Sequence, residues 1–209
     1  MDEITKKKVF FEYELIYDNI LGNLYPAKKS TGFPERNLSV NFSKAYETIA
    51  LKNNENACSW FEFQFGSSNN LHVDAVIYNI SLQELLIIES KRYSNPASKM
   101  REVGEDILRI GSFITEINEE NKEGIVRIDM RKITSVYGII LADIWNETQL
   151  KKDICHSYLE GMANPDSDGA FLQKYKEKIG IDRIPYDLNY YVSRTVIRNY
   201  NLLSFMWKL

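Results

Sequence analysis

Residues 84–92 read ELLIIESKR, and this stretch decides the fold. Its first half, Leu85–Ile88, is an unbroken apolar run, which is typical of a strand in the middle of a sheet that is covered on both faces. The run is followed by Glu89 and Lys91, which lie two residues apart and therefore project from one face of a strand. Ionisable groups at the end of a buried strand are costly unless they are paired or bind something. The stretch therefore predicts a central strand with a candidate site at its end.

Two further strands are predicted before this stretch and one after it. The segment Ser59–Phe65 alternates Phe with Trp, Glu and Gln, and Leu71–Tyr78 follows the turn 66–70. The close succession of these segments indicates hairpin connections. Ser135–Trp145 is apolar on both faces, which predicts a fourth, buried strand.

Helical spacing of apolar residues predicts the elements around these strands. We expect a first helix over 7–25, a second that carries an apolar stripe from Leu38 to Ile49 and ends near Asn53, and a long third over 98–118. The order α-β-β-β-α-β then covers about residues 35–145. Beyond it we expect a C-terminal helical elaboration over 146–209, with helices over 147–161 and 171–179 and a tyrosine-rich end without a clear period. The sequence thus predicts a single α/β domain, 1–209, with a mixed sheet flanked by helices.

The composition is that of an ordinary folded domain, with 44% hydrophobic and 26% charged residues in a chain of 209. The net charge of −3 excludes an overall positive field, so any nucleic acid must be bound by a local patch. Cys58 and Cys155 are far apart and have no CxxC neighbour, which indicates neither a disulfide framework nor a zinc site. The charged N-terminal segment and the lack of an apolar run of about 18 residues lead us to expect a cytoplasmic protein without a membrane partner.

Asp74 brings a second carboxylate toward the candidate site. In a regular strand it shares a face with His72 and Val76, and a hairpin can set it beside Glu89. Two carboxylates this close repel each other unless a cation lies between them, and their oxygens suit Mg²⁺ or Mn²⁺. Such a metal polarises a phosphodiester oxygen and acidifies a water, which Lys91 can orient. These residues favour metal-dependent phosphodiester hydrolysis.

Asp74, followed after 14 residues by Glu89-Ser90-Lys91, resembles the motif of the PD-(D/E)xK nuclease superfamily, which includes restriction endonucleases, Holliday-junction resolvases and many repair and defence nucleases. The predicted α-β-β-β-α-β order is similar to the core of that superfamily. The resemblance implies a restriction-endonuclease-like fold and a Mg²⁺-dependent deoxyribonuclease, in which Asp74 and Glu89 hold the metal and Lys91 assists the nucleophile. The chain has Val73 at the position where the motif's name has proline. Many members of the superfamily also lack that proline.

The superfamily often adds a glutamate from the helix that precedes the sheet. Glu47, beside Tyr46 at the edge of the apolar stripe, is the best match, and the resemblance implies that it is a third metal ligand. Glu12 and Glu14 on the first helix match less well. A solvated position on the helix surface is the alternative for Glu47. The resemblance also implies DNA as the partner, and a homodimer, because many members act as dimers on two strands.

Basic residues near the site are candidates for phosphate contacts. Arg92, Lys99 and Arg101 could form the local patch that the acidic total requires, as could Arg109, although solvated helix charge explains them equally well. A second candidate patch lies near the C-terminus, where basic and aromatic residues would combine charge with stacking, although core packing of the tyrosines is the simpler reading. Its members are Arg194, Arg198, Tyr190, Tyr191 and Tyr200.

Two other functions fit the same residues. One is a non-catalytic nucleic-acid-binding or interaction subunit that retains the nuclease fold, against which the intact set of Asp74, Glu89 and Lys91 argues. The other is an enzyme that acts on RNA or on a nucleotide. His72 could assist the reaction or bind a phosphate, but a structural role is the simpler interpretation, because a lone histidine more often has that role.

Overall fold

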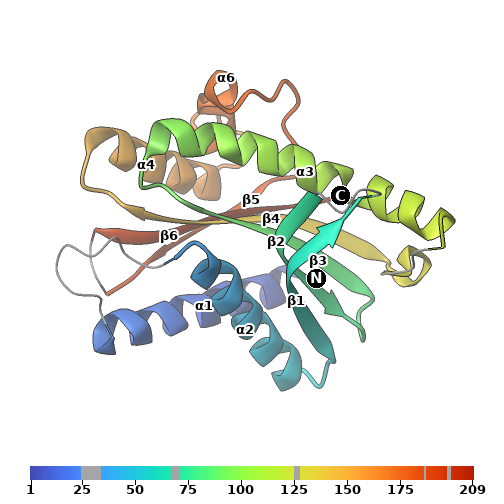
Figure 1. Ribbon diagram of the computed structural model, residues 1–209. Helices are drawn as coiled ribbons and strands as arrows, with labels where there is room; N and C mark the ends of the chain where they lie inside the picture. Colours follow the sequence, from blue (N-terminus) through green and yellow to red (C-terminus); the bar gives the residue numbers. More distant parts are fainter. Residues whose placement is uncertain (25–33, 67–70, 125–127, 186, 197–198) are drawn as a thin grey trace.

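A six-stranded mixed sheet lies at the centre of the computed structural model, which describes residues 1–24, 34–66, 71–124, 128–185, 187–196 and 199–209 (Figure 1). The strands lie in the order β1-β2-β3-β4-β6-β5. β3 and β4 run parallel, and the other neighbouring pairs are antiparallel. The strands are β1 (Ala57–Phe65), β2 (Leu71–Asn79), β3 (Glu84–Arg92), β4 (Ser135–Trp145), β5 (Asn189–Arg194) and β6 (Tyr200–Lys208).

β3 is the central strand that its sequence predicts. Residues Leu85–Ile88 are all 0% exposed, because helices cover both faces of the sheet at this level. Parallel strands need a crossover connection, and the helix α3 (Pro96–Lys122) supplies it between β3 and β4. The carboxyl ends of β3 and β4 therefore lie at the same edge of the sheet.

Helices form a layer on each face of the sheet (Figure 1). α1 (Glu3–Asn23) and α2 (Arg36–Lys52) pack together on one face. α3 and α4 (Gln149–Ala163) cover the other face, with the short helices α5 (Phe171–Lys174) and α6 (Lys176–Ile179) beside them. A 3-10 helix, η1 (Met130–Lys132), precedes β4. None of the helices described is long and apolar enough to span a membrane.

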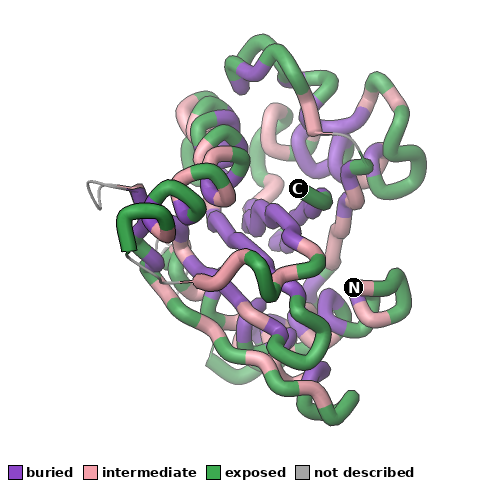
Figure 2. Tube along the Cα trace, turned by 90° about the vertical axis from the view of Figure 1, so that its right-hand side faces the viewer, coloured by how far each residue is buried: buried purple, intermediate pink, exposed green. Residues whose placement is uncertain are grey.

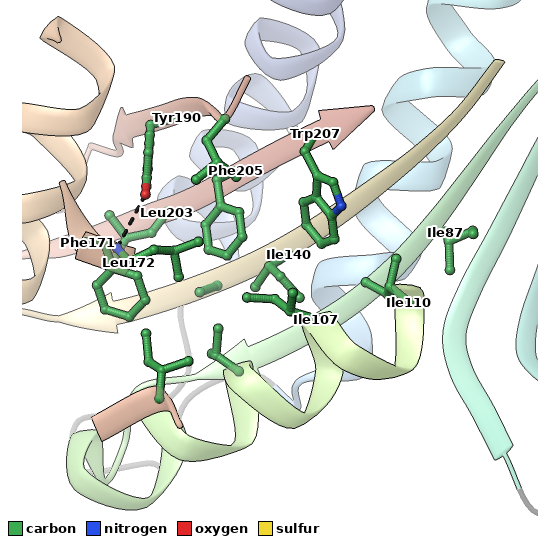
Figure 3. Close-up of a cluster of buried hydrophobic side chains, with 14 of the residues drawn as sticks. Ile87, Ile107, Ile110, Ile140, Phe171, Leu172, Tyr190, Leu203, Phe205 and Trp207 are labelled. Carbon is green, nitrogen blue, oxygen red and sulfur yellow. Dashed lines mark hydrogen bonds between the residues drawn. The ribbon is translucent and has the colours of Figure 1, made fainter. Parts of the chain in front are cut away.

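The hydrophobic core consists of two layers, one between the sheet and each helix pair. Figure 2 shows the buried parts of the chain in the interior of the molecule. In the layer under α3 and α4, Ile107 and Ile110 face β4 and β6, where Phe205 and Trp207 fill the space (Figure 3). Gly138 of β4 lets these side chains approach, because a Cβ there would lie 2.8 Å from Ile110 Cγ2 and would overlap the Trp207 ring.

The α/β class, the mixed sheet and the flanking helices are as the sequence predicts, and the elements up to Trp145 agree with the expected ones within a few residues. The helix predicted over 147–161 is α4, and the one predicted over 171–179 is divided into α5 and α6. The turn residues 67–70 lie outside the described residues.

The prediction of a helical elaboration over 146–209 is wrong for its last part. β5 and β6 form a hairpin, and β6 pairs with β4 to complete the sheet. All of β6 except Lys208 is buried, because helices cover it on both sides. Its sequence therefore lacks the two-residue alternation by which a half-exposed strand is recognised.

Candidate active site

Asp74 and Glu89 meet where β2 and β3 separate. The β2–β3 ladder pairs Ala75 with Ile88 as its outermost residues, so Asp74 and Glu89 are the next position on each strand. The backbone N–H of Ser90 donates a hydrogen bond to Asp74 Oδ2 at 2.7 Å, which fixes the Asp74 carboxylate against β3. The two carboxylates predicted to converge are thus brought together by the register of the hairpin.

Helix α3 completes this cluster with one carboxylate and one guanidinium. Glu89 and Lys91 project from the face of β3 that α3 covers. Lys91 Nζ lies 2.7 Å from Asp106 Oδ2, and Arg109 Nη1 lies 2.6 Å from Glu89 Oε1 and 3.0 Å from Asp106 Oδ1. Asp106 and Arg109 are three residues apart on the helix, so both face the sheet. The side chains of Glu89 and Asp106 are only 3% and 2% exposed.

The pKa values reflect crowding of negative charge in a buried place. Burial raises the pKa of Glu89 to about 8, and the carboxylates of Asp106 and Asp74 add to the rise while Arg109 opposes it. Burial likewise raises the pKa of Asp74, against the hydrogen bond from Ser90 N–H. Burial alone would lower the pKa of Lys91, but Asp106, with the charges of Glu89 and Glu35, outweighs it and the pKa lies above the usual lysine value. Lys91 therefore stays protonated near neutral pH.

The alternation of side chains between the two faces of the sheet is interrupted in both β1 and β2 beside Asp74. Phe63 packs in the layer under α3, whereas Phe61, two residues earlier, packs in the layer under α1 and α2. The residue between them, Glu62, has a φ of 53°, which is unusual for a residue other than glycine. In β2, Val73 and Ala75 are divided between the two layers in the same way. Local backbone strain of this kind is concentrated at functional sites.

This break in the alternation corrects the expectation that His72, Asp74 and Val76 share one face. Val73 and Val76 both pack under α3, so the regular alternation of β2 is broken at Asp74. His72 is exposed and pairs with Gln64 of β1. The exposed Glu62 was missed by sequence reasoning, although its charge acts on Asp74 and raises its pKa.

The structure does not bring Glu47 to the cluster. Glu47 Oε1 accepts a hydrogen bond from Ser59 Oγ at 2.6 Å, and Ser59 pairs with Ile77, three residues along β2 from Asp74. In the described part of the chain, no three His, Cys, Asp or Glu side chains are grouped so as to hold a metal ion. The expected trio of Asp74, Glu89 and Glu47 is therefore replaced by a pair. Glu12 and Glu14 belong to α1, on the opposite face of the sheet from Glu89.

The predicted phosphate-binding residues are mostly engaged in ion pairs. Arg92 projects to the α1–α2 face, where its Nη2 lies 2.9 Å from Oδ2 of the buried Asp143. Lys99 Nζ lies 2.8 Å from Glu102 Oε2 and 3.1 Å from Glu35 Oε1. Arg101 Nε lies 3.6 Å from Glu105 Oε1 and is largely exposed. These three residues do not form one patch beside Glu89.

In the second candidate patch, Arg194 is the last residue of strand β5, and Arg198 lies outside the described residues. Tyr190 and Tyr200 are buried, and the ring of Tyr191 stacks on Phe10, which confirms core packing as the role of the tyrosines.

The donor set of the cluster suits a hard divalent cation. Asp74, Glu89 and Asp106 supply three carboxylates, and Lys91 and Arg109 supply two cations. One negative charge is left over when all five groups are ionised. Asp74 and Glu89 are the two carboxylates that repel each other without an intervening cation, and oxygen ligands of this kind are the ones that Mg²⁺ and Mn²⁺ prefer. These two residues could hold such a cation.

Comparison of the chain with models of protein families, with curated proteins and with solved structures finds no match.

Proposed function

We propose that the protein is a Mg²⁺- or Mn²⁺-dependent nuclease that hydrolyses DNA phosphodiester bonds, with a fold of the restriction-endonuclease type. The observation that carries the proposal is the convergence of Asp74 and Glu89 at the point where β2 and β3 separate, with Lys91 on the same side of β3. DNA rather than RNA follows from the resemblance of the motif alone. Restriction, defence and repair are the processes to which such an enzyme would belong.

Asp74 and Glu89 would hold the metal, and each has one oxygen already fixed by a protein donor. Ser90 N–H fixes Asp74 Oδ2, and Arg109 fixes Glu89 Oε1. Such donors orient the carboxylates before a cation arrives, which is how supporting residues favour binding. A bound divalent cation would polarise a phosphodiester oxygen and lower the pKa of water.

Lys91 would act as a fixed positive charge and hydrogen-bond donor rather than as a base. Its side chain is 11% exposed and is held by Asp106, which keeps it protonated. A protonated amine can orient the attacking water and offset the charge that develops on the phosphoryl oxygens. Asp106 is thus a positioning residue for Lys91.

The test combines isothermal titration of Mn²⁺ with cleavage of a supercoiled plasmid in Mg²⁺ or Mn²⁺. Wild type is compared with Asp74→Asn and with Asp166→Asn, which removes an exposed carboxylate elsewhere. We expect wild type and the control to bind Mn²⁺ and cut the plasmid, and Asp74→Asn to do neither. Mn²⁺ binding that is unchanged in Asp74→Asn would overturn the site.

A second candidate function is a non-catalytic nucleic-acid-binding or interaction subunit with the same fold. The observation that favours it is that Glu89 and Lys91 are both engaged by α3, through Arg109 and Asp106, as in a structural ion-pair network. In that case wild type binds DNA, and plasmid cleavage is absent with either metal.

A further inference from the structure

A second polar site lies at the edge of the sheet where β4 ends. It is an open pocket of about 460 Å³ between α4, the end of β5 and the start of β6. One wall is a single face of α4, with Lys152, Cys155, His156 and Leu159 at helical spacing. The other walls are lined by Asn146, Arg194, Thr195 and Asn201.

The charge of this pocket is positive. Lys152 and Arg194 line it, and within the described residues neither forms an ion pair. Arg194 lines the pocket together with Cys155, and its charge opposes the rise in pKa that burial gives the Cys155 thiol. No lining residue is a carboxylate, and the nearby Glu160 lies 3.2 Å from His156 Nδ1. The pocket therefore offers two unneutralised cations in a protein whose net charge is −3.

A buried donor at the pocket lacks an acceptor. Asn201 is 3% exposed, and its side-chain Nδ2 has no hydrogen-bond partner within the described structure. A buried N–H group without an acceptor is costly and calls for an explanation such as a bound ligand. The neighbouring Thr195 is satisfied, because its Oγ1 donates to the Tyr200 carbonyl at 3.0 Å. Within the described residues no group supplies the acceptor that Asn201 lacks, so the pocket has room for an acceptor of a bound ligand.

The pocket shares a face and an edge of the sheet with the candidate active site. Lys91 pairs with Ala142 of β4, and Ala142 pairs with Leu203 of β6, so the three residues form a row across the sheet. Asn201 lies two residues further along β6, on the same face as Leu203. Standard strand spacings put the Cα atoms of Lys91 and Asn201 about 12 Å apart.

We propose that this pocket binds a phosphate group of the nucleic-acid strand that enters the candidate active site, an inference that rests on the proposed function. Guanidinium, ammonium and amide N–H groups are the donors that proteins use for phosphate oxygens. A separation of about 12 Å corresponds to a few nucleotides of one nucleic-acid strand. The pocket would thus position the strand without touching the scissile bond.

The test is binding of a fluorescent DNA oligonucleotide to the full chain in EDTA, followed by anisotropy between about 50 and 200 mM salt, so that cleavage plays no part. The double variant Lys152→Gln with Arg194→Gln is compared with Lys176→Gln with Arg131→Gln, which removes two exposed charges elsewhere. We expect the pocket variant to bind about tenfold more weakly, with a salt slope lower by about 1, and the control to bind like wild type. Asn201→Ala is expected to weaken binding without changing the slope.

The outcomes separate the pocket from the nuclease. Equal DNA affinity and equal salt slope in the pocket and control variants would overturn the pocket proposal. An absence of DNA binding by wild type would also overturn it. Both conclusions hold whether or not plasmid cleavage depends on Asp74. Weaker binding by the pocket variant supports the pocket even if wild type cuts nothing, in which case only the nuclease proposal fails. Oligonucleotides with a 5′-phosphate or a 5′-hydroxyl distinguish a terminal phosphate from an internal one.

Discussion

Metal binding is expected to strengthen with pH, because Glu89 retains a proton near neutrality. Burial, together with the charges of Asp106 and Asp74, raises its pKa to about 8 in spite of Arg109. A carboxyl group with that pKa is about 1% ionised at pH 6 and about half ionised at pH 8. Since the ionised form is the one that binds Mg²⁺, the affinity should rise about 50-fold, or about 2 kcal/mol, between these pH values.

Isothermal titration of Mg²⁺ at pH 6, 7 and 8, in two buffers of different ionisation enthalpy, measures both the affinity and the protons released. We expect close to one proton per metal at pH 7, because Glu89 is about 90% protonated there. Lys91 contributes none, since Asp106 keeps its pKa above the usual value. Glu177→Gln, on the exposed surface of α6, should behave like wild type, whereas Glu89→Gln should bind weakly and without this pH dependence.

Two results would refute this reasoning. One is a Mg²⁺ affinity that stays constant from pH 6 to 8 in wild type, which would mean that Glu89 is ionised throughout or is no ligand. The other is proton release that persists unchanged in Glu89→Gln, which would assign the proton to another group.

Three further substitutions test the placement of single residues. Glu47→Gln should leave Mn²⁺ affinity unchanged in isothermal titration, because Glu47 is engaged by β1 rather than by the acidic pair; a loss of affinity would restore it as a ligand. Gly138→Ala should lower the free energy of unfolding in urea by about 1–3 kcal/mol, since the added methyl group overlaps Trp207. Asp143→Ala should lower it by about 3–5 kcal/mol, because Arg92 would lose its buried partner; a change below about 1 kcal/mol would show that the pair is solvated.

The part of the fold that the sequence predicts is the part whose signals are local. β1, β2 and β3 follow one another through short connections, and β3 is a continuous apolar run. β5 and β6 were not predicted, because β6 is buried on both sides and lies between β4 and β5 only through long-range pairing. The apolar run Leu202–Leu203 and the aromatic residues after it carry no period that separates a buried strand from a helix.

In the candidate site, too, the residues that could be predicted are those whose positions depend on local structure. Asp74, Glu89 and Lys91 could be predicted together because one hairpin register fixes their relative positions. Glu47 could not be placed, since the position of α2 along the sheet depends on packing that its own sequence does not encode. Asp106 gave one usable signal, a carboxylate next to Ile107 on the apolar stripe of α3, where an unpaired charge would be costly.

Substitution of Asp74 distinguishes a metal site from an ion-pair network that only stabilises the fold. Burial raises the pKa of Asp74, so its ionised form is costly in the metal-free protein. Once Glu89 is also ionised, Glu89 and Asp106 balance Lys91 and Arg109, and Asp74 adds an uncompensated negative charge to a buried place. Asp74→Asn should therefore stabilise the metal-free protein at pH 8 by about 1 kcal/mol, as removal of a charge kept for function commonly does. Wild type should gain stability when Mg²⁺ is added, and the variant should not.

Urea unfolding at pH 8 with and without Mg²⁺ measures both effects. If the ion-pair network only stabilises the fold, Asp74→Asn should still stabilise the metal-free protein. Mg²⁺ should then change the stability of neither wild type nor the variant. A stabilisation by Mg²⁺ that is equal in wild type and in Asp74→Asn would reject the site at this position. A buried charge that weakens the fold yet is needed for the metal to bind has its explanation in function, since packing alone would favour the neutral asparagine.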